Sequence, residues 1–190
     1  MIERDRRRRV VLLCISFARN LAYYQAGQCG PARALLCASH PKAGFWRQVN
    51  ANFLDVGVLE WYKLFGDRKG EHDWRQVVSD PTKFEVDLLQ HLGMDRATFE
   101  QEVKVIRTYR DKFVAHLDKC NVMDVPLFDT AKKVLWFYHH HVVAFEARPG
   151  DLVGLSADTT EKLTLGYKQC LQEAEELFTS SLRFSTKRDS

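Results

Sequence analysis

Residues 107–118, Arg107-Thr-Tyr-Arg-Asp-Lys-Phe-Val-Ala-His-Leu-Asp118, place charged side chains and a histidine inside a regular helical pattern. Apolar residues around this stretch recur at helical spacings and form one stripe: Phe99, Val103, Ile106, Phe113 and Leu117. One member of the stripe is missing, and Arg110 occupies its position. An arginine on a core-facing stripe requires an ion-pair partner, a cleft or an interface, because an unpaired buried charge costs several kcal/mol.

The size and composition of the chain fit one soluble domain. It has 190 residues, of which 45% are hydrophobic and 28% charged. We expect a single domain over residues 1–184 and a disordered tail over 185–190. The formal net charge is only +3, so the chain has no overall electrostatic commitment to nucleic acid.

Cysteine usage and hydropathy indicate the compartment. The chain has five cysteines, an odd number, and no Cys-x-x-Cys pair. This argues against a disulfide framework or a zinc site and favours a reducing, cytoplasmic environment. No apolar run approaches the ~20 residues that span a bilayer. We therefore expect no membrane association, no metal and no cofactor.

The periodicity predicts an all-α, single-domain bundle of about five main helices. Asp95 is the expected N-cap of the helix that carries the opening stretch and runs to about Asp118. Gly66 and Gly93 are expected to end two other helices. The arginine-rich N-terminus opposes the dipole of the first helix, so we expect it to be frayed or paired. The expected helical segments are about 5–25, 31–36, 41–65, 73–79, 81–90, 95–118, 126–148 and 158–177.

Arg110 and His116 do not share a face of one straight helix, on which they lie roughly 120° apart. Two arrangements would bring them together. In one, the helix bends or ends near His116. In the other, two copies of the helix face each other across a symmetric dimer, which also explains an arginine on an apolar stripe.

These two side chains suit phosphodiester cleavage in RNA. A histidine with a pKa near ~6.5 accepts or donates a proton at neutral pH. A guanidinium group presents a planar fork of donors to a phosphate whose charge grows in the transition state. The 2′-hydroxyl of RNA is an internal nucleophile, so a histidine and an arginine suffice without a metal.

The same residues carry a family resemblance. Arg110-Asp111-x4-His116 matches the Arg-x(4–6)-His motif of the HEPN superfamily (higher eukaryotes and prokaryotes nucleotide-binding). The longer string from Tyr109 to Asp118 is similar to the abortive-infection, AbiU-like branch of that superfamily. The upstream residues 59–66 and 72–74 add to the likeness, which covers about a third of the chain.

The resemblance implies an all-α homodimer with metal-independent endoribonuclease activity, of the defence or toxin type, with RNA as substrate and an antitoxin or regulator as a further partner. It implies that Arg110 stabilises the phosphate, that His116 is the acid–base and that Asp111 is the polar helper. Active members often have asparagine at the helper position, and Asp111 places a negative charge beside the phosphate. The positive charges of Arg107 and Lys112 offset it, and with Tyr109 they complete the predicted RNA- or phosphate-binding set.

Two other interpretations remain open. The chain could be a non-catalytic module that holds a nucleotide, an RNA or a protein in the same cleft. It could also be a structural dimer or adaptor, in which Arg110 pairs with an acidic residue of a neighbouring helix and His116 is a hydrogen-bonded helix-end residue.

Other candidate residues have simpler explanations. Three consecutive histidines, residues 139–141, point in three directions on a helix and cannot hold one metal together. Nothing in the sequence favours Cys120 as a nucleophile over an ordinary thiol. Aromatic residues at helical spacing are far more often core than base-stacking platforms, and we expect this of the four tryptophans: Trp46, Trp61, Trp74 and Trp136.

Overall fold

Helices make up all the regular structure in the described part of a computed structural model, which covers residues 3–30, 32–37, 40–115, 126 and 128–186. Of residues 113–115 and 183–186 it describes the backbone alone. The helices are α1 (Glu3–Gln28), α2 (Ala32–Leu36), α3 (Ala43–Phe65), α4 (Trp74–Val77), α5 (Pro81–Leu92), α6 (Arg96–Tyr109), α7 (Phe128–His141) and α8 (Thr160–Thr186), with two π-helical turns, η1 (Arg110–Ala115) and η2 (Val142–Glu146). The all-α prediction is confirmed, with more helices than the five or so main ones expected.

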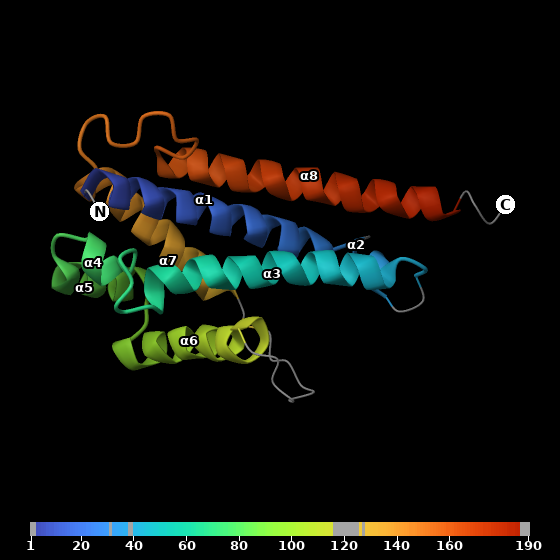
Figure 1. Cartoon of the computed structure of the whole chain (residues 1–190), viewed down its shortest axis with the longest axis horizontal. Coiled ribbons are helices and arrows are strands. Elements are labelled where there is room, and N and C mark those ends of the chain that lie inside the picture. Colours follow the sequence, from blue (N-terminus) through green and yellow to red (C-terminus); the bar gives the residue numbers. More distant parts are fainter. Residues whose placement is uncertain (1–2, 31, 38–39, 116–125, 127, 187–190) are drawn as a thin grey trace.

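The long helix α1 is the centre of the bundle. It packs against α3 on one side and α8 on the other, with α3 running antiparallel to both (Figure 1). Helix α7 packs against α1, α5 packs against α7, and α6 lies along the outer side of α3. The main core fills the end of the bundle near the N-terminus, and a smaller cluster joins α1, α2 and α8 toward the other end: Ala26, Ala32, Leu35, Ala174 and Phe178.

Capping residues explain several helix boundaries. The Asp95 side chain accepts a hydrogen bond from the Thr98 backbone N–H at 2.7 Å, which confirms Asp95 as the N-cap of α6. Gly93 ends α5 with a φ of 65°, in the left-handed region that glycine adopts without strain. Gly93 thus fixes where α5 ends, and Asp95 fixes where α6 begins.

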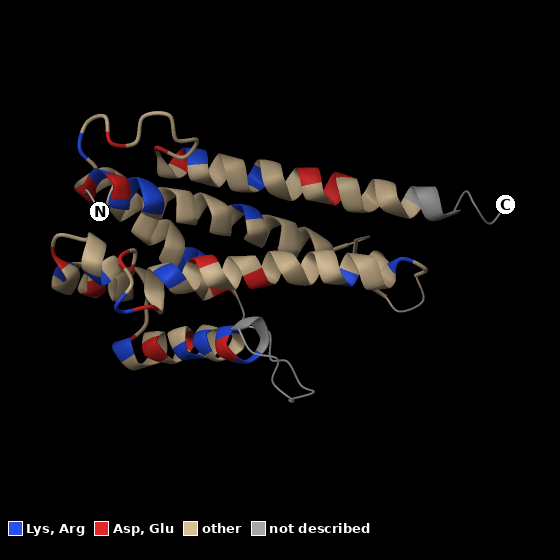
Figure 2. Cartoon of the chain, viewed as in Figure 1, with Lys and Arg blue, Asp and Glu red and all other residues tan. Residues whose placement is uncertain are grey.

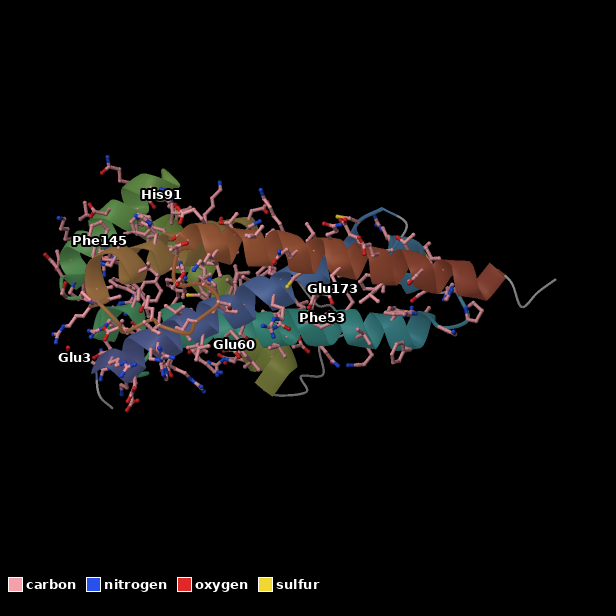
Figure 3. The ribbon with its side chains drawn as sticks, turned by 90° about the horizontal axis from the view of Figure 1, so that it is seen from above. Glu3, Phe53, Glu60, His91, Phe145 and Glu173 are labelled. Carbon is pink, nitrogen blue, oxygen red and sulfur yellow. The ribbon has the colours of Figure 1, made fainter. Side chains whose placement is uncertain are left out.

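The arginine-rich start of α1 is paired within the chain. Arg7 is buried, and its Nε donates to Asp151 Oδ2 at 2.8 Å. Arg8 donates to the backbone carbonyls of Asp151 and Val153 at 2.7 and 2.9 Å. The loop before α8 is thereby held against α1. Seen from above, Glu3 of α1 and Phe145 of η2 lie at this same end of the bundle (Figure 3).

Two predicted boundaries differ from the structure. The helix expected to continue to Asp118 is α-helical only to Tyr109 and continues as the π-helical η1, while residues 116–125 lie outside the described residues. The final helix extends to Thr186, so Ser185 and Thr186 are helical rather than part of a tail, and residues 187–190 lie outside the described residues. Within the described ranges, no helix combines the length and apolarity that crossing a bilayer requires.

Candidate functional site

Arg110 lies over the ring of an aromatic residue from α3. Its guanidinium carbon is 3.8 Å from the centroid of the Tyr62 ring, within the range of a cation–π contact. Its side chain is 25% exposed, and its Nε lies 2.9 Å from Oδ1 of Asp111, whose side chain is 48% exposed. The Nε–H is not hydrogen-bonded to that oxygen, so the contact is an ion pair only. Arg110 is therefore held mainly by Tyr62 and stays open to solvent.

The position of the Tyr62 ring depends on Gly66, one turn further along. A Cβ atom at Gly66 would lie 2.3 Å from Cδ2 of Tyr62, well inside van der Waals contact. Gly66 was expected as the end of this helix, which is confirmed, and its N–H donates to the Tyr62 carbonyl at 2.8 Å. Its φ is −105°, a value open to any residue. Space for the ring, rather than backbone freedom, requires a glycine here.

Arg107 contacts the same tyrosine. Its guanidinium carbon is 6.0 Å from the Tyr62 centroid, and its Nη2 donates to the Gly66 carbonyl at 3.0 Å. Its Nε is buried and has no hydrogen-bond partner among the described residues. Tyr62, Gly66, Arg107 and Arg110 thus form one unit, the arginine cradle, built by the end of α3 and the junction of α6 with η1.

Tyr109, which was predicted to bind RNA or phosphate, lies in the core. It is only 3% exposed, and its hydroxyl donates to Asp55 Oδ1 at 2.9 Å. Burial raises the pKa of the Asp55 carboxyl, and the hydrogen bond from Tyr109 opposes that rise. Burial and the neighbouring carboxylate also raise the pKa of the Tyr109 hydroxyl, so it stays protonated. Tyr109 therefore fastens α6 to α3 from within the core, where it exposes almost no surface.

The remaining predicted site residues lie around η1. Asp111 is half exposed and Lys112 is exposed. His116, the predicted acid–base, lies outside the described residues, as does Cys120. The change from α- to π-helix begins at Arg110. The bend or helix end that one of the two predicted arrangements requires was expected near His116, outside the described residues. Such π-helical turns are rare and occur frequently at functional sites.

The three consecutive histidines do point in different directions, as predicted. His139 is fully buried, with Nε2 3.0 Å from the Ala157 carbonyl, and burial lowers its pKa to about 4. His140 is exposed beside Phe145, and His141 lies 3.2 Å from Glu146 Oε1. No group of three or more histidine, cysteine, aspartate or glutamate side chains in the described ranges is placed to hold a metal ion.

The tryptophans pack as core residues. Trp61 and Trp74 are almost fully buried, and the Trp61 Nε1–H donates to the Ala131 carbonyl at 3.0 Å. Trp136 donates to Thr164 Oγ1 at 3.0 Å, and Trp46 packs on Phe178. All four tryptophans therefore have packing roles, as the sequence predicted.

No role was predicted for Tyr62 from the sequence. It lies in the upstream segment 59–66, which was considered only because it adds to the family resemblance. A signal was present, because a tyrosine one helical turn before a glycine places an aromatic ring over a position without a side chain. Charged residues of both signs follow one another along α6 (Figure 2). Because this helix has many charged residues, the sequence alone does not indicate which of them contacts Tyr62.

Comparison with family models, with curated proteins and with solved structures gives no match for this chain. Its functional interpretation therefore rests on the Arg110–His116 motif and on the geometry of the arginine cradle.

Proposed function

We propose that this chain is a metal-independent endoribonuclease of the HEPN type, in which Arg110 binds the phosphate that is cut and His116 transfers the protons. The observation that supports this best is the surroundings of Arg110, namely its contacts and its exposure to solvent. Its guanidinium is fixed on the Tyr62 ring and partly exposed, and among the described residues its only ion-pair partner is the adjacent, half-exposed Asp111.

This arrangement favours a phosphate-binding role over a structural one. A structural arginine on a core-facing stripe would be paired with an acidic residue of a neighbouring helix, and the described part of the chain has no such partner for Arg110. An ion pair with an exposed neighbour contributes only about 0–1 kcal/mol. An RNA phosphodiester, whose negative charge is shared by two oxygens, can accept two parallel hydrogen bonds from the guanidinium and displace that carboxylate.

The reaction follows from the two side chains. His116 takes the proton of the 2′-hydroxyl, whose oxygen forms a new bond to phosphorus. The bond from phosphorus to the 5′-oxygen breaks, and the protonated imidazole returns a proton to that leaving oxygen. Arg110 stabilises the charge that grows on the phosphoryl oxygens between these events. The products are a 2′,3′-cyclic phosphate and a free 5′-hydroxyl.

A homodimer is part of the proposal, because the resemblance implies one and because a second copy would supply the His116 that one straight helix does not bring to the face of Arg110. The resemblance to the abortive-infection branch supports a cytoplasmic defence or toxin-type effector with RNA as substrate and an antitoxin as partner.

The test is cleavage of end-labelled mixed RNA in the presence of EDTA. We expect His116→Ala to lower the rate by about 10²–10⁴-fold and Arg110→Ala by about 10²–10³-fold. Lys168→Ala, a substitution of an exposed cation on α8, is the matched control and should leave the rate unchanged. Cleavage that persists equally in the His116 and Arg110 variants would show that the motif is not the active site.

One observation favours a second function, a non-catalytic RNA- or nucleotide-binding module. Asp111 lies 2.9 Å from Arg110 and competes with a phosphate for the same guanidinium. RNA binding that Arg110→Glu abolishes, without cleavage by the unmodified chain, would establish this module in place of the nuclease.

A further inference from the structure

A hollow of about 350 Å³ lies beside the arginine cradle, between α6 and the segment that joins α3 to α4. Its apolar walls include Phe65, Phe99 and Val103. Its polar lining is dominated by positive charge, because it contains four cationic side chains and a single acidic one: Arg68, Arg75, Lys104, Arg107 and Glu100. We call this hollow the Arg107 pocket.

The negative charges near this pocket do not balance its cations. The charge of Arg75 is balanced by Asp73, which does not line the pocket. Nη1 of Arg75 lies 3.1 and 3.2 Å from the two carboxylate oxygens of Asp73. Glu100 is shared, because both Arg68 and Arg96 lie 3.4 Å from its Oε1. Lys104 and Arg107 have no carboxylate partner in the described part of the chain. The pocket therefore carries an excess of positive charge at a concave surface, where an anion is favoured.

Arg107 gives the charge excess a specific donor. One of its nitrogens is used by the Gly66 carbonyl, but its buried Nε has no acceptor among the described residues. A buried donor without an acceptor is destabilising, and few occur in folded proteins. An oxygen-rich anion in the pocket would instead pair with the Arg107 guanidinium, whose charge no carboxylate of the described residues balances.

The pocket and the proposed phosphate site share a wall. The guanidinium groups of Arg107 and Arg110 lie 6.0 and 3.8 Å from the centroid of the same Tyr62 ring, so their separation cannot exceed the sum of these distances. Consecutive phosphates of one nucleic-acid strand can bridge such a gap. A flexible single strand can turn a phosphate into a hollow, whereas a duplex holds its phosphates on a rigid outer surface.

We propose that the Arg107 pocket binds the backbone phosphate next to the one held by Arg110, which makes single-stranded RNA the ligand of this surface. This assignment rests on the proposed role of Arg110 in binding the phosphate that is cut. It adds Lys104 and Arg68 as positioning residues, which hold the strand and do not contact the reacting atoms.

The test measures binding apart from cleavage. A fluorescein-labelled oligouridylate is titrated with the His116→Ala variant of the 190-residue chain in EDTA at several salt concentrations, and fluorescence anisotropy gives Kd. Arg68 and Lys104 are exposed, so the double substitution Arg68→Gln, Lys104→Gln should preserve the fold, which a thermal melt checks. We expect Kd to rise about tenfold or more. The slope of log Kd against log salt should become shallower by ~0.7 for each phosphate that the double variant no longer neutralises.

Two matched variants sharpen the result. Glu100→Gln removes the acidic lining residue and should tighten binding. Lys168→Gln removes one positive charge from α8, outside the pocket lining, and should change little. Unchanged Kd and salt slope in the double variant, or equal affinity for duplex RNA of the same length, would overturn the assignment. If the unmodified chain does not cut RNA but the double variant still binds more weakly, the proposed nuclease fails while the pocket stands.

Discussion

Replacing Gly66 with alanine should disturb the arginine cradle without straining the backbone. The new Cβ would lie 2.3 Å from Cδ2 and 2.4 Å from Cε2 of Tyr62, whereas carbon atoms pack at ~3.5–4.0 Å. The ring must therefore move by more than about 1 Å. Because the φ of −105° suits any residue, the backbone is not strained, and the destabilisation arises from this displacement, offset in part by the ~0.4–1 kcal/mol that Gly→Ala gains through the unfolded state.

The expected magnitudes follow from that displacement. Overpacking of this kind costs about 1–3 kcal/mol of stability. Arg110 is also deprived of a cation–π interaction at a partly exposed site, worth about 0.5–1 kcal/mol, which corresponds to roughly two- to fivefold weaker binding of RNA phosphate. Thermal melts measure the first effect, and the anisotropy titration with oligouridylate measures the second.

Two variants serve as controls for this prediction. Gly166→Ala places a methyl group on α8 where nothing lies within 4 Å, and it should stabilise the chain by about 0.5–1 kcal/mol. Tyr62→Leu removes the ring without overpacking and should weaken RNA binding to a similar extent. If Gly66→Ala melts at or above the temperature of the unmodified chain and binds RNA equally well, Tyr62 does not hold Arg110 in place.

The remaining predictions concern charge. Burial lowers the pKa of His139 to about 4 from the ordinary 6.5, so between these pH values the unfolded chain binds more protons than the folded one. Stability should therefore fall as the pH drops through this window, by up to about 3 kcal/mol. Urea denaturation at pH 5 and 7 measures this, and His139→Leu should shrink the difference. Asp111→Asn removes the carboxylate that competes for Arg110, so it should tighten RNA binding and increase cleavage; weaker binding would instead make Asp111 part of the site.

Much of the helical organisation can be predicted from local sequence signals. Asp95 and Gly93 set their helix boundaries through caps, which depend only on residues within one turn. The end of regular α-helix at Tyr109 could not be found in this way, because the apolar stripe continues through Phe113 and Leu117 and a periodicity argument assumes a constant turn.

The candidate site, too, could be predicted from the sequence only in part. The sequence identified Arg110 as an unusual residue, since a charge on an apolar stripe is visible in the pattern itself. The sequence did not reveal that Arg110 contacts an aromatic ring from α3 rather than a carboxylate from another helix. Arg107 and Tyr109 are near neighbours in sequence, but helical geometry directs one toward the Arg107 pocket and the other toward Asp55.

The most direct test of the proposed site mixes two inactive variants. His116→Ala and Arg110→Ala chains are unfolded together, refolded as a mixture and assayed for RNA cleavage in EDTA. If the site combines Arg110 of one subunit with His116 of the other, each mixed dimer regains one intact site, and about a quarter of the unmodified activity should return. Activity no greater than that of the separate variants would contradict a site shared across a dimer cleft.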